Sequence, residues 1–433
     1  MGPRYENTPQ PRPTRVTRRR ALSLGLAVAA GSALVGCGQE ERTANGRTVL
    51  EFPSWQAGDS TFSLWWKELI AAFRKQRPDI EVDFYGLPFD SYVDQITIRF
   101  AANDRPDILH LPARNAAEFA GRGWLTPLES RLRGTDVAGT WTPLQEEMAL
   151  CGKDYGVLLL GYGYCLYYNE ALLRSVGARV PTTVEEMITT AEAITGKGVY
   201  GFGATTAPSP DNYTELAAFV VGGGGALSRD DGTFSADSDA AVAGLDQYRR
   251  ALAQAPRGIQ PQQRNELFLT GKIAMLLDGP FFLNELAGAS TRVRPALSVA
   301  RAPFRRVPGG VSNSIHIPAG LDARRTQAVW DFIELATTPT WQRRYVELTV
   351  NPAPRRGSLT ARAVARTPEL ELFQNLADEA VSIFPGDQTH RERFGRISDI
   401  VSAAATSLIT TGESTAGIAA HLQRQLDQAL ESS

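Results

Sequence analysis

Apolar and amphipathic segments alternate in two separate runs along this chain, and that alternation limits the folds it can adopt. In the first run, strand-like segments at 48–55, 79–87 and 105–113 are separated by helix-like segments at 62–78 and 91–104. This order is typical of a parallel sheet covered by helices. The alternation restarts further along the chain. We therefore predict an α/β fold of two lobes, which suits a length of 433 residues.

Two helices in these runs can be predicted in more detail. The segment 62–78 is apolar at helical spacing and ends at a proline, and its buried face is predicted to hold Leu64, Trp65, Leu69, Ala72 and Phe73. In the second run, which starts after residue 165, the segment 181–195 opens with Thr-x-x-Glu, the pattern of a capping box. We predict Thr182 as the N-cap with Glu185 as its partner.

The first 37 residues differ from the rest of the chain. Residues 1–20 contain six arginines and one acidic residue, and an uncharged apolar run of 16 residues follows at 21–36. This run is shorter than the ~20 residues of a membrane-spanning helix. The stretch 17–22 resembles a twin-arginine export motif, although the general secretory route is equally open. Residues 34–37 resemble the lipobox of bacterial lipoproteins, so we expect Cys37 to become an acylated N-terminus, followed by a flexible tether to residue 47.

The charge and composition of the chain limit the kinds of partner that we expect it to bind. Of 45 basic residues six lie in the first 37 positions, and of 47 acidic residues one does, so the remaining chain carries a formal charge of −7. Nucleic acid is not expected as a partner, because phosphate binding needs concentrated Lys and Arg. No apolar stretch after the signal has membrane-spanning length, so we expect membrane contact through the lipid anchor only, on the outer face of the cell membrane or in the periplasm.

No catalytic or metal-binding motif stands out. The sequence contains neither G-x-S-x-G nor H-E-x-x-H, and Gly271-Lys272 lacks the remainder of a phosphate-binding loop. A glycosidase needs two carboxylates about 5–10 Å apart, and nothing in the spacing singles out such a pair. The three cysteines include no cluster at zinc-ligand spacing, and whether Cys151 and Cys165 form a disulfide stays open. We expect no enzyme activity, metal or cofactor.

Four stretches resemble, in order, the extracellular solute-binding proteins of the family that includes maltose-binding protein, the carbohydrate receptors of ABC importers. The resemblance covers most of 48–430, and its most specific stretches are Arg105–Leu128, Cys165–Met187, Leu267–Phe282 and Gln327–Gly357. It implies a two-lobe periplasmic-binding-protein-like α/β fold of type II, whose chain crosses three times between lobes that close on a ligand.

The predicted crossings lie in short segments rich in Gly, Pro, Ser and Asn, which suit backbone rotation. They are placed near Gly161–Gly163, Gly309–Ser312 and Asn351–Pro354. Lobe one is then predicted to contain 48–161 and 311–351, and lobe two 162–310 and 352–433.

The resemblance implies a monomeric receptor that binds a mono- to oligosaccharide or a polyol and delivers it to the permease subunits of an ABC importer. Two alternatives stay open. One is a receptor for a non-sugar solute, such as a phosphorylated polyol, a glycerol phosphate diester or a peptide. The other is a lipid-anchored hydrolase on the same scaffold.

Candidate ligand-binding residues follow from sugar chemistry. Sugar C–H faces stack on aromatic rings, and hydroxyls pair with polar side chains in loops at strand ends. In lobe one and at the first crossing we predict Trp55, Gln56, Asp59, His110, Arg114, Asn115, Tyr162 and Tyr164. Members of the family often carry Asp at the position of Pro112 and an acidic contact at that of Tyr162, which indicates altered specificity.

The remaining candidates follow residue 208. The segment 208–216 is expected to be an irregular polar loop, which includes Glu215 as a further hydroxyl partner. Members of the family place a stacking tryptophan at the position of Phe281, and some reach the ligand with an arginine at that of Arg355. Phe282 is expected to point to the core. The predicted residues in this part are Asp211, Asn212, Tyr213, Phe281, Gly310, Ser312 and Arg355.

Overall fold

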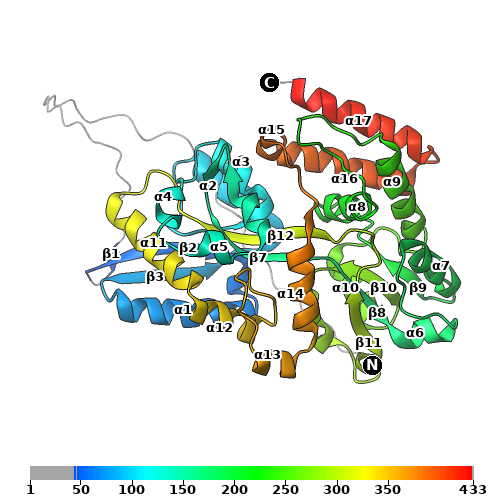
Figure 1. Ribbon diagram of the computed structural model, residues 1–433, viewed down its shortest axis with the longest axis horizontal. Coiled ribbons are helices and arrows are strands. Elements are labelled where there is room, and N and C mark those ends of the chain that lie inside the picture. The colour runs from blue at the N-terminus through cyan, green and yellow to red at the C-terminus, as the bar shows by residue number, and fades with distance from the viewer. Residues whose placement is uncertain (1–42, 45, 432–433) are drawn as a thin grey trace, which may run out of the picture. The chain divides into compact units, whose positions relative to one another are not determined.

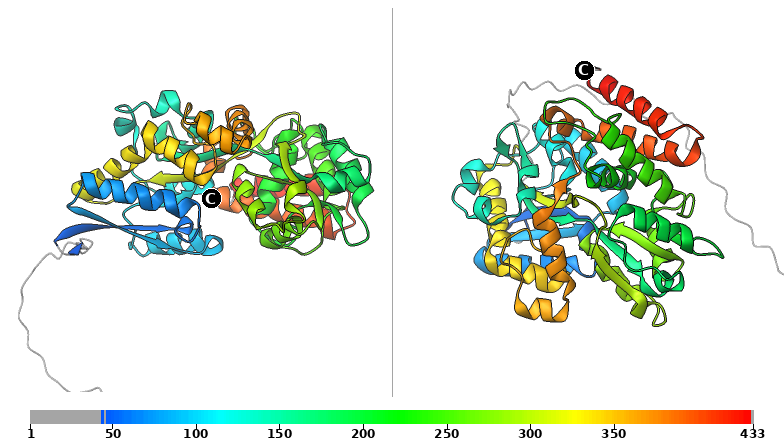
Figure 2. Two further views of the ribbon diagram at one scale, coloured as in Figure 1. Left: turned by 90° about the horizontal axis from the view of Figure 1, so that it is seen from below. Right: turned by 45° about the vertical axis from the view of Figure 1, so that its right-hand side comes forward.

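The computed structural model describes residues 43–44 and 46–431, which form two α/β lobes (Figure 1). Cys37, the export signal and most of the tether lie outside the described residues. Lobe one contains the blue, cyan and yellow elements of Figure 1, and lobe two contains most of the green and red ones. Figure 2 shows the same division from two further sides. The predicted two-lobe α/β fold is confirmed by the solved structures compared below.

Lobe one is built around the parallel strands β2 (Arg47–Ser54) and β3 (Ile80–Gly86). The third predicted strand, β4 (Leu109–Pro112), pairs with the antiparallel strand β12 (Pro308–His316). The prediction of a wholly parallel sheet is therefore wrong in this detail. The other elements of lobe one are β1 (Thr43–Ala44), α1 (Phe62–Gln76), α2 (Phe89–Ala101), α3 (Ala116–Gly121), α4 (Glu129–Leu132), α5 (Val137–Thr140), β5 (Ala149–Leu150), β6 (Lys153–Asp154), α11 (Ala323–Thr337) and α12 (Pro339–Thr349).

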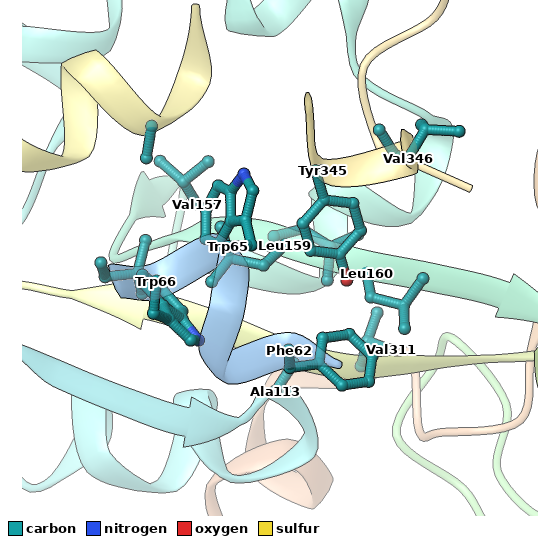
Figure 3. Packing of buried hydrophobic residues seen from close by; sticks show 14 of the residues in the cluster. Phe62, Trp65, Trp66, Ala113, Val157, Leu159, Leu160, Val311, Tyr345 and Val346 are labelled. Carbon is teal, nitrogen blue, oxygen red and sulfur yellow. The ribbon is translucent and has the colours of Figure 1, made fainter. Parts of the chain in front are cut away.

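Helix α1 buries a face that differs in part from the predicted one. Trp65, Leu69 and Phe73 are buried, but Leu64 is 45% exposed, and Trp66 is buried in its place. Trp66 packs edge-on against Phe52, with ring centroids 4.9 Å apart. Figure 3 shows the side chains of α1 meeting those of β7, β12 and α12. The large buried side chains of α1 recur at helical spacing and form one amphipathic stripe, which contains Phe62, Trp65, Trp66, Leu69 and Phe73.

Two antiparallel strands run from lobe one into lobe two, namely β7 (Val157–Gly163) and β12. Gly163 lies where helix α14 (Glu369–Glu379) packs on β7. A Cβ atom added there would lie 2.7 Å from the carbonyl oxygen of Leu376 and 2.5 Å from Val307 Cγ1. The close approach of backbone to backbone therefore requires glycine at this point between the lobes.

The segment after α12 stays with lobe one further than the sequence predicts. The backbone amide of Thr142 donates to the carbonyl of Pro354 (2.8 Å), and that of Arg356 donates to Thr140 (2.7 Å). These bonds hold Pro354 and Arg356 beside Thr142 and Thr140 of lobe one, at the end of the segment in which the third crossing was predicted. The chain continues through α13 (Ala361–Arg366) and α14 before β13 (Val381–Ser382) pairs with the start of β12.

Lobe two contains a mixed sheet in the order β11-β8-β10-β9. Its strands are β8 (Cys165–Asn169), β9 (Tyr200–Gly203), β10 (Ile273–Asp278) and β11 (Leu297–Arg301). Its helices are α6 (Glu170–Ser175), α7 (Val184–Ile194), α8 (Asp211–Gly222), α9 (Asp239–Leu252), α10 (Pro261–Leu269), α16 (Phe394–Thr410) and α17 (Thr415–Glu431). The short α15 (Gln388–Glu392) contacts α3 and thereby lobe one.

The cap of α7 lies one residue later than predicted. Thr183 is the N-cap, and its hydroxyl accepts a hydrogen bond from the amide of Glu186 (3.2 Å). Thr182 lies outside the helix and donates both its amide and its hydroxyl to the Glu186 carboxylate, each at 2.8 Å. The type of motif was predictable, but two adjacent threonines followed by two adjacent glutamates give two registers of equal quality.

Cys151 and Cys165 are both free thiols, the first exposed and the second buried, so they form no disulfide. In the part of the chain that the structure describes, no helix combines the length and apolar character needed to cross a membrane. The same residues include no group of three or more His, Cys, Asp or Glu side chains arranged to hold a metal ion.

Candidate functional site

A cavity of about 870 Å³ lies between the two lobes. Its walls come from loops that follow β2 and β4 in lobe one, and from α8, α10 and the segment after β10 in lobe two. The volume is in the range of small-molecule sites. Nine of the predicted ligand-binding residues line this cavity, namely Trp55, Gln56, Asp59, Arg114, Tyr162, Tyr164, Asp211, Phe281 and Ser312.

Trp55 forms an aromatic platform in the lobe-one wall. It opens the short 3-10 helix η1 (Trp55–Ala57) directly after β2. The ring of His110 stacks on its indole with centroids 4.0 Å apart and an interplanar angle of 6°. Tyr92 packs edge-on against the indole at 4.9 Å. Since His110 covers one face, the cavity is reached by the other.

His110 does not line the cavity, although the sequence placed it among the ligand contacts. Its imidazole is fully buried between Ser54 and Asn313, with Nδ1 2.8 Å from Ser54 Oγ and Nε2 3.2 Å from Asn313 Oδ1. Burial lowers the pKa of His110 to about 3, so the ring is neutral at physiological pH. The neutral imidazole packs against the face of the Trp55 indole and holds that ring in place.

Some polar groups of the lobe-one wall already form hydrogen bonds within the protein. Gln56 Oε1 accepts a hydrogen bond from the indole of Trp66 (2.8 Å). Asp59 Oδ1 accepts from the backbone amides of Thr61 (2.7 Å) and Phe62 (2.8 Å) at the start of α1. Arg114, in the 3-10 helix η2 (Ala113–Asn115), is half-buried and forms no ion pair with any residue that the structure describes.

Three aromatic rings meet at the base of the cavity. The ring of Tyr162 packs edge-on against those of Tyr164 and Phe281, each with centroids 5.5 Å apart. Burial raises the pKa of both tyrosine hydroxyls, which therefore stay protonated. Phe281 lies in the 3-10 helix η4 (Pro280–Gly288) and lines the cavity. The next residue, Phe282, is fully buried and packs against Tyr167.

Behind these rings lies an ionic network that sequence reasoning missed. The Arg264 guanidinium, from α10, bridges the carboxylates of Glu215 on α8 and Asp278 at the end of β10. Its Nη1 is 3.1 Å from Glu215 Oε1, and all three residues are buried. The Tyr248 hydroxyl also donates to Glu215 (3.1 Å). Burial raises the pKa of Glu215 to about 7 and that of Asp278 above its usual range, against the influence of Arg264.

The outer part of the lobe-two wall is polar. Asn265 Oδ1 accepts from Arg264 Nε (3.0 Å), and its Nδ2 donates to Glu285 Oε2 (2.9 Å). Burial, and after it the negative charge of Asp278, raises the pKa of Glu285. Asn284 Nδ2 donates to the carbonyl of Thr349 at the end of α12 (2.8 Å), which links lobe two to lobe one beside the cavity.

Two predicted residues on the segment 208–216 belong to the core. This segment is not an irregular loop, because α8 begins at Asp211. Asn212 is buried, accepts from the amide of Ser209 (2.7 Å) and donates to the carbonyl of Thr205 (2.8 Å). Tyr213 is buried and donates its hydroxyl to the carbonyl of Ile383 (2.9 Å). A helical register would have placed Asp211 and Glu215 together, since residues four apart share a helix face.

Three further predicted residues do not line the cavity. The guanidinium of Arg355 pairs with both carboxylate oxygens of Asp136. Asn115 is buried, and its Oδ1 has no hydrogen-bond partner within the described residues. Gly310 pairs with Tyr162 across the β7–β12 ladder, where a Cβ atom would lie 2.9 Å from the tyrosine hydroxyl. For Arg355 and Gly310 the local sequence gives no sign of the distant residue that contacts them.

Comparison with known families identifies the type of protein. The sequence model described as "Bacterial extracellular solute-binding protein" matches residues 59–343, which is more than half of the chain. The chain belongs to this family. The match includes most of the lobe-one wall and all of the cavity-lining lobe-two residues named above. The resemblance seen in the sequence is thereby confirmed.

Individual members of this solute-binding family are more distant. An uncharacterized lipoprotein from the oleD 5′ region of Streptomyces antibioticus is 31% identical over 200 residues, which cover 43% of this chain and 41% of that protein. The chain thus spans less than half the length of that relative. The GacH receptor of Streptomyces glaucescens, solved unliganded and with acarbose, is 21% identical, with a TM-score of 0.76 over 89% of this chain and 98% of that one. UgpB from Mycobacterium tuberculosis, solved with glycerophosphocholine, is 22% identical, with a TM-score of 0.75 over 89% and 99%.

Proposed function

We propose that this protein is the substrate receptor of an ABC importer and that it binds a carbohydrate or a polyol in the cavity between its lobes. The observation that carries the proposal is the cavity itself, whose walls come from both lobes and combine aromatic rings with hydrogen-bonding groups. Saccharides present C–H faces and hydroxyls, and this lining supplies a partner for each.

A ligand in this position favours closure. The side chains of Trp55 and Phe281 belong to opposite lobes, so a solute that touches both gains contacts only when the lobes approach. Such a ligand shifts the population toward the closed form by its difference in affinity for the two forms. The permease of the importer then recognises the closed receptor. We propose that the hinge comprises the β7–β12 pair and the segment from Arg366 to Val381.

The lobes follow from the same contacts. We propose that lobe one contains residues 48–161 and 311–366, and lobe two 162–310 and 381–431. The backbone bonds from Thr142 and Arg356 support the longer second part of lobe one. We expect the protein to act as a monomer, because one chain supplies both walls of the cavity.

We propose that the protein binds its ligand without converting it. The two most buried carboxylates of the cavity, Glu215 and Asp278, share the Arg264 guanidinium, and backbone amides donate to each of them. Groups held in this way form a rigid wall. A general acid or base must exchange a proton with the ligand. Carboxylates that are held by Arg264 and by backbone amides are not placed for such an exchange.

We propose that Cys37 carries the lipid that holds the receptor outside the cell. The sequence pattern at 34–37 supports this anchor, and one relative from Streptomyces antibioticus is itself named a lipoprotein. The acarbose named for GacH supports a saccharide-like solute for the fold, whereas the glycerophosphocholine named for UgpB is a glycerol phosphate diester and belongs to the alternative class of solutes.

A thermal-shift screen of the purified full chain tests the proposal. The panel contains mono-, di- and oligosaccharides, polyols and their phosphorylated forms. A ligand at 100 times its dissociation constant stabilises the native state by about 2.7 kcal/mol, so its melting temperature rises. We expect a shift with a neutral saccharide or polyol and no product after prolonged incubation. A shift with phosphorylated compounds alone, or turnover of the bound ligand, would contradict the proposal.

A further inference from the structure

The two walls of the cavity carry different charge. In the lobe-one wall, Asp59 and Arg114 balance each other. In the lobe-two wall, Arg264 is the one cation among the described lining residues, and it faces four acids, namely Asp211, Glu215, Asp278 and Glu285. This wall therefore carries a formal charge of −3, or −2 when Glu215 binds a proton.

The single cation of that wall is already engaged. Arg264 donates to Glu215, Asp278 and Asn265, and these hydrogen bonds engage four of the five N–H groups of its guanidinium. Asp211 forms no ion pair with a residue that the structure describes. Glu285 accepts a hydrogen bond from the neutral amide of Asn265 and forms no ion pair with a residue that the structure describes. Two carboxylates at the cavity surface therefore lack a cationic partner.

The carboxylates also act on one another. Burial raises the pKa of Asp278, and the negative charge of Asp211 adds to this rise. Burial likewise raises the pKa of Glu285, with smaller additions from Asp278 and from Asp59 across the cavity. A positive charge between the walls would relieve this repulsion, whereas an anion would increase it.

We propose that the solute selected by this cavity carries a protonated amine, which lies against the lobe-two wall between Asp211, Asp278 and Glu285. This inference rests on the proposed function, because it names the class of saccharide or polyol that the receptor takes. The faces of Trp55 and Phe281 suit such a ligand, since aromatic faces attract cations as well as sugar C–H groups. The phosphorylated solutes considered from the sequence are disfavoured, because Arg355 is paired with Asp136 and only Arg114 remains.

Isothermal titration of the purified full chain with matched pairs of probes tests the inference. In two pairs one hydroxyl is replaced by an amine, namely glucose and glucosamine, and sorbitol and 1-amino-1-deoxysorbitol. In the third pair, cellotriose and the glucosamine trimer, one hydroxyl of each sugar unit is replaced. Glucuronate and glucose 6-phosphate serve as anionic probes. We expect the amine to bind at least tenfold more tightly than its neutral partner in every pair that binds.

Two variants test whether the carboxylates of Asp211 and Glu285 bind the amine of the ligand. Asp211→Asn and Glu285→Gln each remove one carboxylate of the wall, and we expect each to lower the ratio of amine to neutral affinity at least threefold. Glu379→Gln is the matched control, because Glu379 is an exposed acid paired with Arg301 on the outer surface and should leave the ratio unchanged.

The outcomes separate the two proposals. Neutral probes that bind as tightly as their amines, or anionic probes that bind more tightly, would overturn this inference and leave the proposed receptor function in place. A panel in which no probe binds would contradict the proposed function and this inference together. An amine preference that survives both variants would overturn the placement of the amine.

Discussion

The indole of Trp55 and the imidazole of His110 lie face to face, with ring centroids 4.0 Å apart and planes 6° from parallel. His110 is in turn held by Ser54 and Asn313, which belong to the two strands β2 and β12. The aromatic platform of lobe one is therefore fixed by one strand of the lobe itself and by one of the strands that lead to lobe two. This arrangement ties the orientation of a cavity-lining ring to a strand of the proposed hinge.

The facing aromatic side chain of lobe two gives the first prediction. Phe281→Ala removes a ring from the cavity wall, and we expect the affinity for the ligand found in the screen to weaken by about 1–3 kcal/mol, because stacking on the ligand is lost. Titration calorimetry measures this change. Tyr200→Ala is the control, since Tyr200 is 36% exposed and does not line the cavity. Unchanged affinity in Phe281→Ala would remove Phe281 from the site.

The burial of His110 predicts how stability depends on pH. Its pKa is lowered from 6.5 to about 3 in the folded protein, so between these values the unfolded state binds a proton that the folded state does not. The free energy of unfolding therefore falls as pH decreases through this window, by up to about 1.4 kcal/mol per pH unit for one group. Urea unfolding at several pH values between 4 and 7 measures the slope.

The variant His110→Gln tests the assignment of this slope. Glutamine retains an amide for Ser54 and Asn313 but does not titrate. The slope of the unfolding free energy with pH should therefore lose the contribution of one titrating group. His316, whose pKa burial lowers to about 4, should still contribute its own slope and serves as the internal reference. An identical slope in the variant and the natural protein would show that His110 does not titrate on unfolding.

The sequence predicted the parts of the fold that depend on local pattern. The alternation of apolar segments predicted the two α/β lobes. The position after a strand end predicted Trp55, Gln56 and Asp59, which line the cavity. The aromatic prediction at Phe281 rested on a resemblance and also falls on the cavity wall. These features need no knowledge of a distant partner.

Most of the features of the site that the sequence missed depend on long-range contacts. Arg264 lies 49 residues from Glu215 and 14 from Asp278, and nothing near any of the three signals the network. Arg355 reads as a ligand contact until Asp136, 219 residues away, is seen to engage it. Trp66 is an exception, because its helical spacing from Phe62 and Leu69 places it on the buried face of α1.

The lipid anchor gives a prediction for cells. Replacing the thiol of Cys37 removes the atom that forms the thioether with the lipid, so the Cys37→Ser protein should leave the membrane fraction. Fractionation followed by immunoblotting measures this. Cys151→Ser is the control, because Cys151 is an exposed free thiol of the folded part and should leave the distribution unchanged. Membrane association that persists in Cys37→Ser would contradict the proposed anchor.

The ionic network behind the cavity gives the last prediction. Arg264→Met leaves Glu215 and Asp278 buried without their shared cation, so we expect the free energy of unfolding at pH 8 to fall by about 3–5 kcal/mol. Arg301→Met is the matched control, because it breaks an exposed pair with Glu379 and should cost less than about 1 kcal/mol. The loss in Arg264→Met should shrink at pH 5, since protonation of Glu215, whose pKa is about 7, removes one of the two stranded charges. Equal losses at the two pH values would show that packing, and not charge, accounts for the role of Arg264.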